Sequence, residues 1–358
     1  MSDGVTSRRL ALDVLERIDR DGAYANLVLR PALDSSVLST RDKALVTELV
    51  YGSTRMRRAL DAIVEPFLAV SVDHHVRAAL RLGAYQLHFL RIPAHAAVSA
   101  TVGATRKRPR GLVNAVLRKV ASVEPTFDGD AVRLSYPDWI VDRLTADLGA
   151  PDALRVLEAM NEPLDAHVRT DGYVQDRASQ DVVGLVDASA GDVVLDVCAA
   201  PGGKATGIAG SGAKVIAGDV HLRRCGLISK NARSTGTVVA VVAADATSFP
   251  VRAGAADIVL IDAPCSGLGS LRRRPDARWR IDPEAPDRLS LLQKRLVAGA
   301  LPLVRPGGRL IYSVCTLTNA ETSAVAAEIP WEPLGQATIR FPDENGDGMW
   351  SQVFLAPG

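Results

Sequence analysis

Residues 195–207 read LDVCAAPGGKATG, an apolar run that leads into a turn of small residues with two adjacent glycines, Gly202 and Gly203. A strand followed by a glycine-rich turn and a helix opens many parallel α/β folds. The turn does not match the phosphate-binding pattern G-x-x-x-x-G-K-[ST], because Cys198 occupies the first glycine position and Ala205 follows the lysine. No register gives G-x-G-x-x-G either. The stretch therefore predicts a ligand-binding turn that does not hold phosphate, with an ordinary strand-to-helix turn as the alternative.

From about residue 165, short apolar runs alternate with amphipathic segments. This alternation predicts a parallel sheet with helices on both faces, which binds ligands at the carboxyl ends of its strands. The strands are expected at 193–197, 214–219, 238–243, 257–261 and 308–314, and the helices near 203–210, 221–234, 287–303 and 319–328.

Residues 1–125 have the pattern of an all-helical domain, with Leu10, Val14 and Ile18 on one face of the first helix. A stretch rich in proline, glycine and aspartate at 121–130 predicts a linker. Further helices are expected at 41–56, 57–70, 73–90, 95–106, 111–120, from Pro137 to Gly149, and at 151–160. We therefore expect a helical domain at 1–125, a linker with a small helical subdomain at 126–164, and an α/β domain at 165–358.

Composition indicates a soluble globular protein, since 47% of the 358 residues are apolar and 23% are charged. No apolar run is long enough to cross a bilayer, and the first ten residues lack an apolar signal region, so we expect a cytoplasmic protein without a membrane partner. The four cysteines contain no C-x-x-C pair, so we expect free thiols and no metal site.

The net charge of +1 hides an asymmetry along the chain. Residues 1–120 contain 19 Lys and Arg against 11 Asp and Glu, whereas the remainder contains 23 against 30. A basic first half suggests contact with a polyanion, and a solvated charged surface is the alternative. Nothing in the sequence demands a partner chain, so we expect a monomer.

Aspartates follow three successive predicted strands, at Asp219, Asp245 and Asp262. A carboxylate after the second strand can accept hydrogen bonds from ribose hydroxyls, and carboxylates repel phosphate. A nucleoside with a positive charge and no phosphate is the better ligand, and S-adenosylmethionine has this chemistry. Each aspartate taken singly could instead cap a helix or a turn.

Cys265 and Cys315 also follow predicted strands, whereas Cys198 and Cys225 are more typical of small buried residues. Two thiols beside a methyl donor suggest chemistry on a poor nucleophile, such as C5 of cytosine. A thiolate that adds to C6 makes C5 reactive, and a nearby carboxyl group can hydrogen-bond N3 and the exocyclic amine. A second cysteine could assist the loss of the C5 proton and the release of the product.

Three segments resemble motifs of the bacterial Fmu/Sun family of 16S rRNA cytosine-C5 methyltransferases, part of the Nop/Sun group: DVCAAPGGKAT at 196–206, DAPCSGLGSLRRRPDARW at 262–279 and YSVCTLTNAE at 312–321. Residues 84–102 and GLVNAVLRKV at 111–120 resemble the family's NusB-like RNA-binding domain. The segment 174–183 resembles the family's segment just before the first catalytic strand, and the segment 347–355 resembles its closing strand. The resemblance covers nearly the whole chain and implies a class I, Rossmann-like methyltransferase domain preceded by an all-α NusB-like domain.

The resemblance also implies roles for single residues. Cys315 would be the nucleophile, Cys265 would promote product release, and Asp262 would lie beside donor and target base. Asp219 would hold the ribose of the donor, and Asp245 would lie near its adenine. The remainder of the donor site would be Cys198, Ala199, Ala200, Pro201, Gly202, Gly203 and Lys204.

The chain departs from the family pattern around the proposed nucleophile. Val314 stands where a threonine or serine is usual, which removes a local hydroxyl. After Cys315 the usual Pro-Glu-Glu-Asn run is replaced by residues 319–322, of which only Glu321 is kept. These departures keep open a second class of function, an RNA-binding assembly factor that has lost catalysis. The same chemistry on tRNA or on another rRNA site is a further alternative.

Two basic stretches are candidate RNA contacts, because arginine and lysine contact phosphates and tryptophan stacks on bases. Solvated basic loops are the alternative. The candidates are Arg106, Lys107 and Arg108 in the first half, and Arg272, Arg273, Arg274, Arg278 and Trp279, together with Arg280, in the second. The target base has to be unpaired or flipped out to enter such a site.

Overall fold

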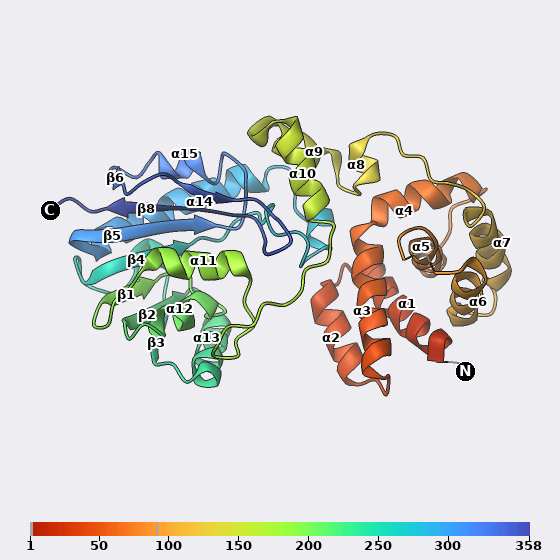
Figure 1. The fold of residues 1–358 in the computed structure, drawn as a ribbon, viewed down its shortest axis with the longest axis horizontal. Helices are drawn as coiled ribbons and strands as arrows, with labels where there is room; N and C mark the ends of the chain where they lie inside the picture. The colour runs from red at the N-terminus through yellow and green to blue at the C-terminus, as the bar shows by residue number, and fades with distance from the viewer. Residues whose placement is uncertain (1–2, 91) are drawn as a thin grey trace. The chain divides into compact units, whose positions relative to one another are not determined.

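The computed structural model describes residues 3–90 and 92–358 and divides the chain into two compact units (Figure 1). The helical unit comprises residues 1–141 together with 273–280, and the sheet unit comprises residues 142–272 and 281–358. Residues 1, 2 and 91 lie outside the described part. None of the described helices is long and apolar enough to cross a membrane.

The helical unit is built around a buried α5. Its helices are α1 (Asp3–Asp21), α2 (Ala25–Asp34), α3 (Thr40–Arg55), α4 (Arg57–Val64), α5 (His74–His88), α6 (Ala94–Ala104), α7 (Arg110–Val120) and α8 (Asp130–Arg133). Leu80 and Leu82 of α5 are fully buried, and so are Leu12 of α1, Leu49 of α3 and Leu117 of α7. Apolar residues at helical spacing thus form one continuous core.

Most of the predicted helix bounds agree with the structure within one or two residues. The helix predicted at 57–70 ends at Val64, where a 3-10 turn with Pro66 begins. The sequence pattern did not predict α2, because Pro31 and the exposed Leu27 weaken its helical pattern. It did not predict α8 in the expected linker either, because four residues are too few to show a helical period.

Residues 273–280 belong to the helical unit, although they follow β4 of the sheet in the chain. The guanidinium of Arg278 is fully buried and donates to the carbonyl oxygens of Arg55 and Ser135. It also lies 3.9 Å from the ring centroid of Tyr136. Trp279 donates from Nε1 to the carbonyl oxygen of Thr54 at 2.8 Å. The chain therefore leaves the sheet unit, anchors in the helical unit and returns.

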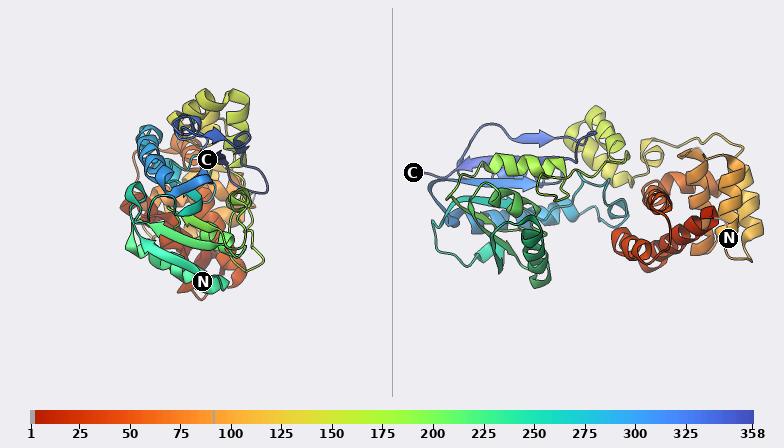
Figure 2. Two further views of the ribbon diagram at one scale, coloured as in Figure 1. Left: turned by 90° about the vertical axis from the view of Figure 1, so that its left-hand side faces the viewer. Right: turned by 60° about the horizontal axis from the view of Figure 1, so that its bottom comes forward.

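The sheet unit has a sheet of eight strands among the described residues, in the order β3-β2-β1-β4-β5-β8-β6, with β7 paired to β8 (strands labelled in Figure 1; Figure 2 gives two further views of the ribbon). The first five strands are parallel, and β8 runs antiparallel to β5. The bounds are β1 (Val193–Asp196), β2 (Lys214–Asp219), β3 (Val239–Ala243), β4 (Ala256–Asp262), β5 (Val304–Val314), β6 (Glu332–Pro333), β7 (Thr338–Arg340) and β8 (Met349–Leu355). The order reverses between β1 and β4, the place where doubly wound sheets bind ligands.

Helices cover both faces of the sheet, as predicted. Alternate residues of β4 enter different cores: Ile258 and Leu260 pack on one face, and Val259 and Ile261 on the other. The first core is closed by α11 (Arg177–Val186), α12 (Gly203–Ala209) and α13 (Leu222–Thr235), and the second by α14 (Ala285–Ala300). The remaining helices are α9 (Asp138–Leu148), α10 (Ala150–Ala159) and α15 (Ser323–Ala326). The last is much shorter than the helix predicted at 319–328.

Candidate active site

The glycine-rich turn between β1 and α12 is held closely against its neighbours. Ala199 donates from its backbone nitrogen to the carbonyl oxygen of Gly218, at the end of β2, at 2.8 Å. Gly202 has a φ of 105°, and a Cβ at this position would lie 3.0 Å from the Cα of Ile228. Only glycine satisfies both the backbone conformation and the close approach to α13. The turn therefore places bare backbone beside the carboxyl ends of β1 and β2.

Asp196, the last residue of β1, is the main polar group beneath this turn. It is fully buried and has no side-chain hydrogen-bond partner among the described residues, although the backbone N–H of Cys198 acts to lower its pKa. Burial, and secondarily the charge of Asp262, raises the pKa of Asp196 to about 7. Buried polar groups in native proteins are nearly always paired. The orphaned carboxylate thus fits a site that receives hydrogen-bond donors or a positive charge from a ligand.

Asp219 and Asp245 follow β2 and β3, but the two side chains differ. Asp219 is buried, accepts from the backbone nitrogen of His221 at 2.9 Å and lies 3.1 Å from Nη1 of Arg224. Asp245 is exposed and caps a 3-10 turn by accepting from Thr247, which lowers its pKa. The capping alternative thus holds at Asp245, and its contact with an adenine stays a prediction.

Lys204 and Asp262 form an ion pair at the carboxyl end of the sheet. Nζ of Lys204 lies 2.7 Å from Oδ2 of Asp262, and Lys204 is only 8% exposed. Burial opposes the charge of Lys204, but the neighbouring carboxylate of Asp262 prevails and raises the pKa of the lysine. The pair fixes the orientation of Asp262 beside the turn.

The two predicted site cysteines lie in contact. Sγ of Cys265, in the loop after β4, is 3.3 Å from Sγ of Cys315, directly after β5. The hydrogen bond from Cys265 lowers the pKa of Cys315, and Ser270 and Lys204 act in the same direction. The same hydrogen bond, together with burial, raises the pKa of Cys265. The two shifts favour Cys315 over Cys265 as the thiolate, although burial and the charge of Asp262 oppose ionisation of Cys315. The thiolate is the nucleophilic form of cysteine.

A buried carboxylate connects the two loops that carry these thiols. Oε1 of Glu321 accepts from the backbone nitrogen of Ser266 at 2.8 Å and from Gln293 at 3.1 Å. Oε2 accepts from the hydroxyls of Ser266, Thr316 and Thr318 at 2.5, 3.2 and 2.9 Å. Ser266 follows Cys265, and Thr316 follows Cys315. Glu321 is thus a positioning residue for the two thiols. The only sequence feature that pointed to this role was its retention in the otherwise altered run 319–322.

Val314 does not affect the thiols as the sequence suggested. Its side chain is fully buried in the core between the sheet and α14, and its partner in the strand register is Trp350. The groups that lower the pKa of Cys315 are Cys265, Ser270 and Lys204. A hydroxyl at position 314 is therefore not needed for this stabilisation of the thiolate.

The basic candidates separate into buried and exposed side chains. Arg272 is 4% exposed and pairs with Asp347 at 3.1 Å, and Arg278 is fully buried. Their prediction as phosphate contacts conflicts with this burial, and we leave both out of the RNA-contact proposal. Charged side chains are rarely buried, so the sequence alone could not reveal that Arg272 and Arg278 are buried. Lys107, Arg108, Arg273 and Arg274 are exposed, Trp279 is partly exposed, and Arg106 is 62% exposed while it pairs with Glu16 at 2.8 Å.

Comparisons with known proteins identify the family of this chain. The family model described as 16S rRNA methyltransferase RsmB/F matches residues 183–331. The chain belongs to this family. The NusB family model matches residues 5–122. These matches confirm the resemblance to Fmu/Sun enzymes and the predicted fold class, and S-adenosylmethionine is the methyl donor of the family, as predicted.

Individual relatives match along most of their length. The ribosomal RNA small subunit methyltransferase B of Thermus thermophilus is 37% identical, covering 89% of this chain and 86% of the relative. The probable ribosomal RNA small subunit methyltransferase B of Bacillus subtilis is 30% identical, with 89% and 86% covered. The crystal structure of PH0851 has a TM-score of 0.75 at 20% identity, with 99% and 98% of the chains covered, and shows the shared fold.

The thiol pair predicts an unusual pH dependence of alkylation. The rate at which iodoacetamide modifies Cys315 should reach half its maximum at a lower pH than the rate for an unperturbed cysteine in a short peptide, because the pKa of Cys315 is lowered. In Cys265→Ala the midpoint should rise, since the hydrogen bond that stabilises the thiolate is lost. Peptide mass spectrometry after timed alkylation measures both. Equal midpoints in the two proteins would contradict the assigned direction of the hydrogen bond.

Glu321→Gln places an amide where five donors meet a carboxylate, so at least one donor loses its acceptor. The free energy of unfolding should fall by about 2 kcal/mol or more, as expected when a charged acceptor is lost in a buried site. The alkylation midpoint of Cys315 should also rise, because the loops that hold the thiols together loosen. Urea denaturation and timed alkylation check the two effects. A destabilised variant with an unchanged midpoint would limit Glu321 to a structural role.

Proposed function

We propose that this protein transfers a methyl group from S-adenosylmethionine to C5 of a cytosine in 16S rRNA through a covalent bond between Cys315 and C6. The observation that carries the proposal is the pair of sulfur atoms 3.3 Å apart, with the thiolate favoured on Cys315. Methylation at an oxygen or at an exocyclic nitrogen needs no cysteine nucleophile, whereas attack by C5 does. The names of the family and of its relatives support rRNA of the small subunit as substrate.

The residues of the donor site fit the proposed methyl donor. The donor, when bound, supplies a methyl group on a positively charged sulfur atom. The orphaned carboxylate of Asp196 can accept hydrogen bonds from it, and the backbone of the turn at Gly202 can approach it closely. Asp219, at the end of β2, is assigned to the ribose hydroxyls. Cys198, Ala199, Ala200, Pro201, Gly203 and Lys204 complete the proposed donor site, and Asp245 is assigned to the adenine side.

The steps on the base use groups of this chain. The thiolate of Cys315 adds to C6, and the electron pair of the C5–C6 bond becomes available at C5, which takes the methyl group as the bond between that methyl carbon and the donor sulfur breaks. Once Cys315 is bonded to C6, Cys265 gives its own proton to solvent and its thiolate accepts the C5 proton. The electron pair of the C5–H bond restores the double bond, the bond between C6 and sulfur breaks, and Cys315 leaves as a thiolate. We assign Cys265 to this release because its sulfur lies next to that of Cys315. Asp262, oriented by Lys204, is assigned to a hydrogen bond with the exocyclic amine of the base.

Loss of catalysis is the less favoured alternative. It rested on Val314 and on the altered run after Cys315. Val314 lies in the core rather than at the thiol, and Glu321, the residue retained in the run, holds both thiol-bearing loops. A chain that served only as an assembly factor would not need this arrangement. The choice between 16S rRNA and tRNA rests on the relatives and on the NusB match.

Two cysteine variants test the covalent step. Cys315→Ala should abolish methyl transfer and leave donor affinity unchanged, because Cys315 acts only on the base. Cys265→Ala should accumulate the RNA adduct, visible as a slowly migrating band in denaturing gels of protein with labelled 16S rRNA and donor. Cys225→Ala, in α13, is the matched control and should turn over without a band. Normal turnover by Cys315→Ala would overturn the proposal, and absence of a band with Cys265→Ala would remove Cys265 from release.

A further inference from the structure

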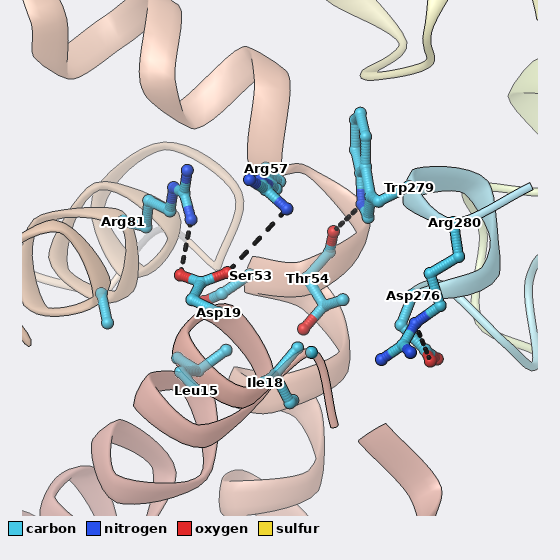
Figure 3. Close-up of a pocket in the computed structure, with 12 residues that line it drawn as sticks. Leu15, Ile18, Asp19, Ser53, Thr54, Arg57, Arg81, Asp276, Trp279 and Arg280 are labelled. Atoms are coloured by element: carbon cyan, nitrogen blue, oxygen red, sulfur yellow. Dashed lines mark hydrogen bonds and ion pairs between the residues drawn. The ribbon is translucent and has the colours of Figure 1, made fainter. Parts of the chain in front are cut away.

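We propose that a cavity in the helical unit binds one unpaired base of the substrate RNA, separate from the base that is methylated. The inference rests on the proposed RNA substrate. The cavity has a volume of about 160 Å³ and lies between α1, α3, α4, α5 and the segment 273–280 (Figure 3). All of these elements belong to the helical unit. Its lining includes Trp279, Arg57, Ser53 and Asp19.

An unsatisfied hydroxyl indicates that the cavity is built for a polar ligand. Ser53 is 1% exposed, and its Oγ has no hydrogen-bond partner among the described residues. A serine inside a helix ordinarily donates to the carbonyl oxygen four residues earlier. Thr54, its neighbour in α3, does so, donating to the carbonyl oxygen of Val50 at 2.7 Å. Ser53 therefore keeps a buried donor and acceptor that a ligand can satisfy.

The same cavity offers a ring for stacking. The indole of Trp279 is held at its edge by the hydrogen bond from Nε1 to the carbonyl oxygen of Thr54. The guanidinium of Arg57 lies 5.7 Å from the indole centroid, and its side chain is 42% exposed (Figure 3). Indole and guanidinium planes are the groups on which proteins stack unpaired bases. The pair thus recognises a planar, polar ring.

The charges favour a base over a phosphate. The carboxylates of Asp19 and Asp276 line the cavity and would repel an anion. The arginines beside them are already paired, Arg81 with Asp19 at 2.7 Å and Arg280 with Asp276 at 3.2 Å. Arg57 is only loosely paired, 4.0 Å from Asp19. A neutral base with donors and acceptors matches this mixture better than a phosphate does.

The segment that completes the cavity comes from the catalytic half of the chain. Residues 273–280 begin eight residues after Cys265 and return to α14. One continuous stretch therefore carries both a thiol assigned to the methylated base and an indole assigned to a second base. This arrangement gives the family's NusB-like domain a specific base contact that its own helices do not supply alone.

Substitutions of Trp279 in the full-length protein test the proposal through the dissociation constant for unmodified 16S rRNA. Trp279→Leu should weaken RNA binding by about 5- to 150-fold, the range expected for loss of one stacked base. Trp279→Phe keeps the ring but loses the hydrogen bond to Thr54, so it should bind within about threefold of the unaltered protein. Trp331→Leu, in the sheet unit, is the matched control and should bind normally. The dissociation constant for S-adenosylmethionine should be the same in all four proteins.

Photo-crosslinking gives a second test, because a residue with only a structural role would not crosslink to the RNA. Ultraviolet irradiation of the complex with unmodified 16S rRNA, which activates every base, should form zero-length crosslinks to peptides that contain Trp279 or Ser53. The proposal is overturned if Trp279→Leu binds rRNA normally, if Trp279→Phe loses as much affinity as Trp279→Leu, or if no crosslink maps to these peptides. Any of these results, with methyl transfer intact, would leave the proposed function standing. Failure of the unaltered protein to bind 16S rRNA would overturn both.

Discussion

The buried carboxylate of Glu321 is the interaction on which the thiol geometry depends. Five donors from the loops after β4 and β5 and from α14 converge on its two oxygens. Burial of a charge is costly unless it is paired or fully hydrogen-bonded, so a carboxylate in this position demands that both loops stay in place. The consequence is a contact of 3.3 Å between Cys265 and Cys315, close enough for one thiol to stabilise the thiolate of the other. Reactivity in this protein is thus a result of loop packing.

The sheet and the donor turn were predictable because local rules determine them. Apolar runs of strand length, separated by helices, specify a parallel sheet, and Gly202 marks the close approach of backbone to α13. The grouping of Cys265, Cys315 and Asp262 follows from the topology alone, since the ends of parallel strands meet at one edge. The resemblance named Cys315 as the nucleophile, but the physical reason that favours the thiolate there was not predictable, because it depends on the distance between the two sulfurs.

Long-range burial explains what the sequence analysis missed. The stretch 271–280 has the composition of a solvated basic loop, but Arg278 is fully buried against Tyr136 and Arg272 against Asp347. When a basic residue packs against a partner more than 70 residues away, the local sequence pattern gives no sign that the basic residue is buried. For the same reason Val314 suggested a weakened nucleophile, although its side chain belongs to the core. Resemblance to a family supplied the candidates for the reacting groups, whereas the contacts show which of the accompanying residues are buried and already paired.

The measurement that tests the central claim most directly is methyl transfer from labelled S-adenosylmethionine to unmodified 16S rRNA and, separately, to unmodified tRNA, with the product mapped by bisulfite sequencing. We expect 5-methylcytosine at one position of the 16S rRNA and none in tRNA. Methylation of tRNA alone would contradict the assignment of the substrate and leave the thiol chemistry in place. Methylation of 16S rRNA at a group other than C5 of cytosine would contradict the covalent mechanism itself.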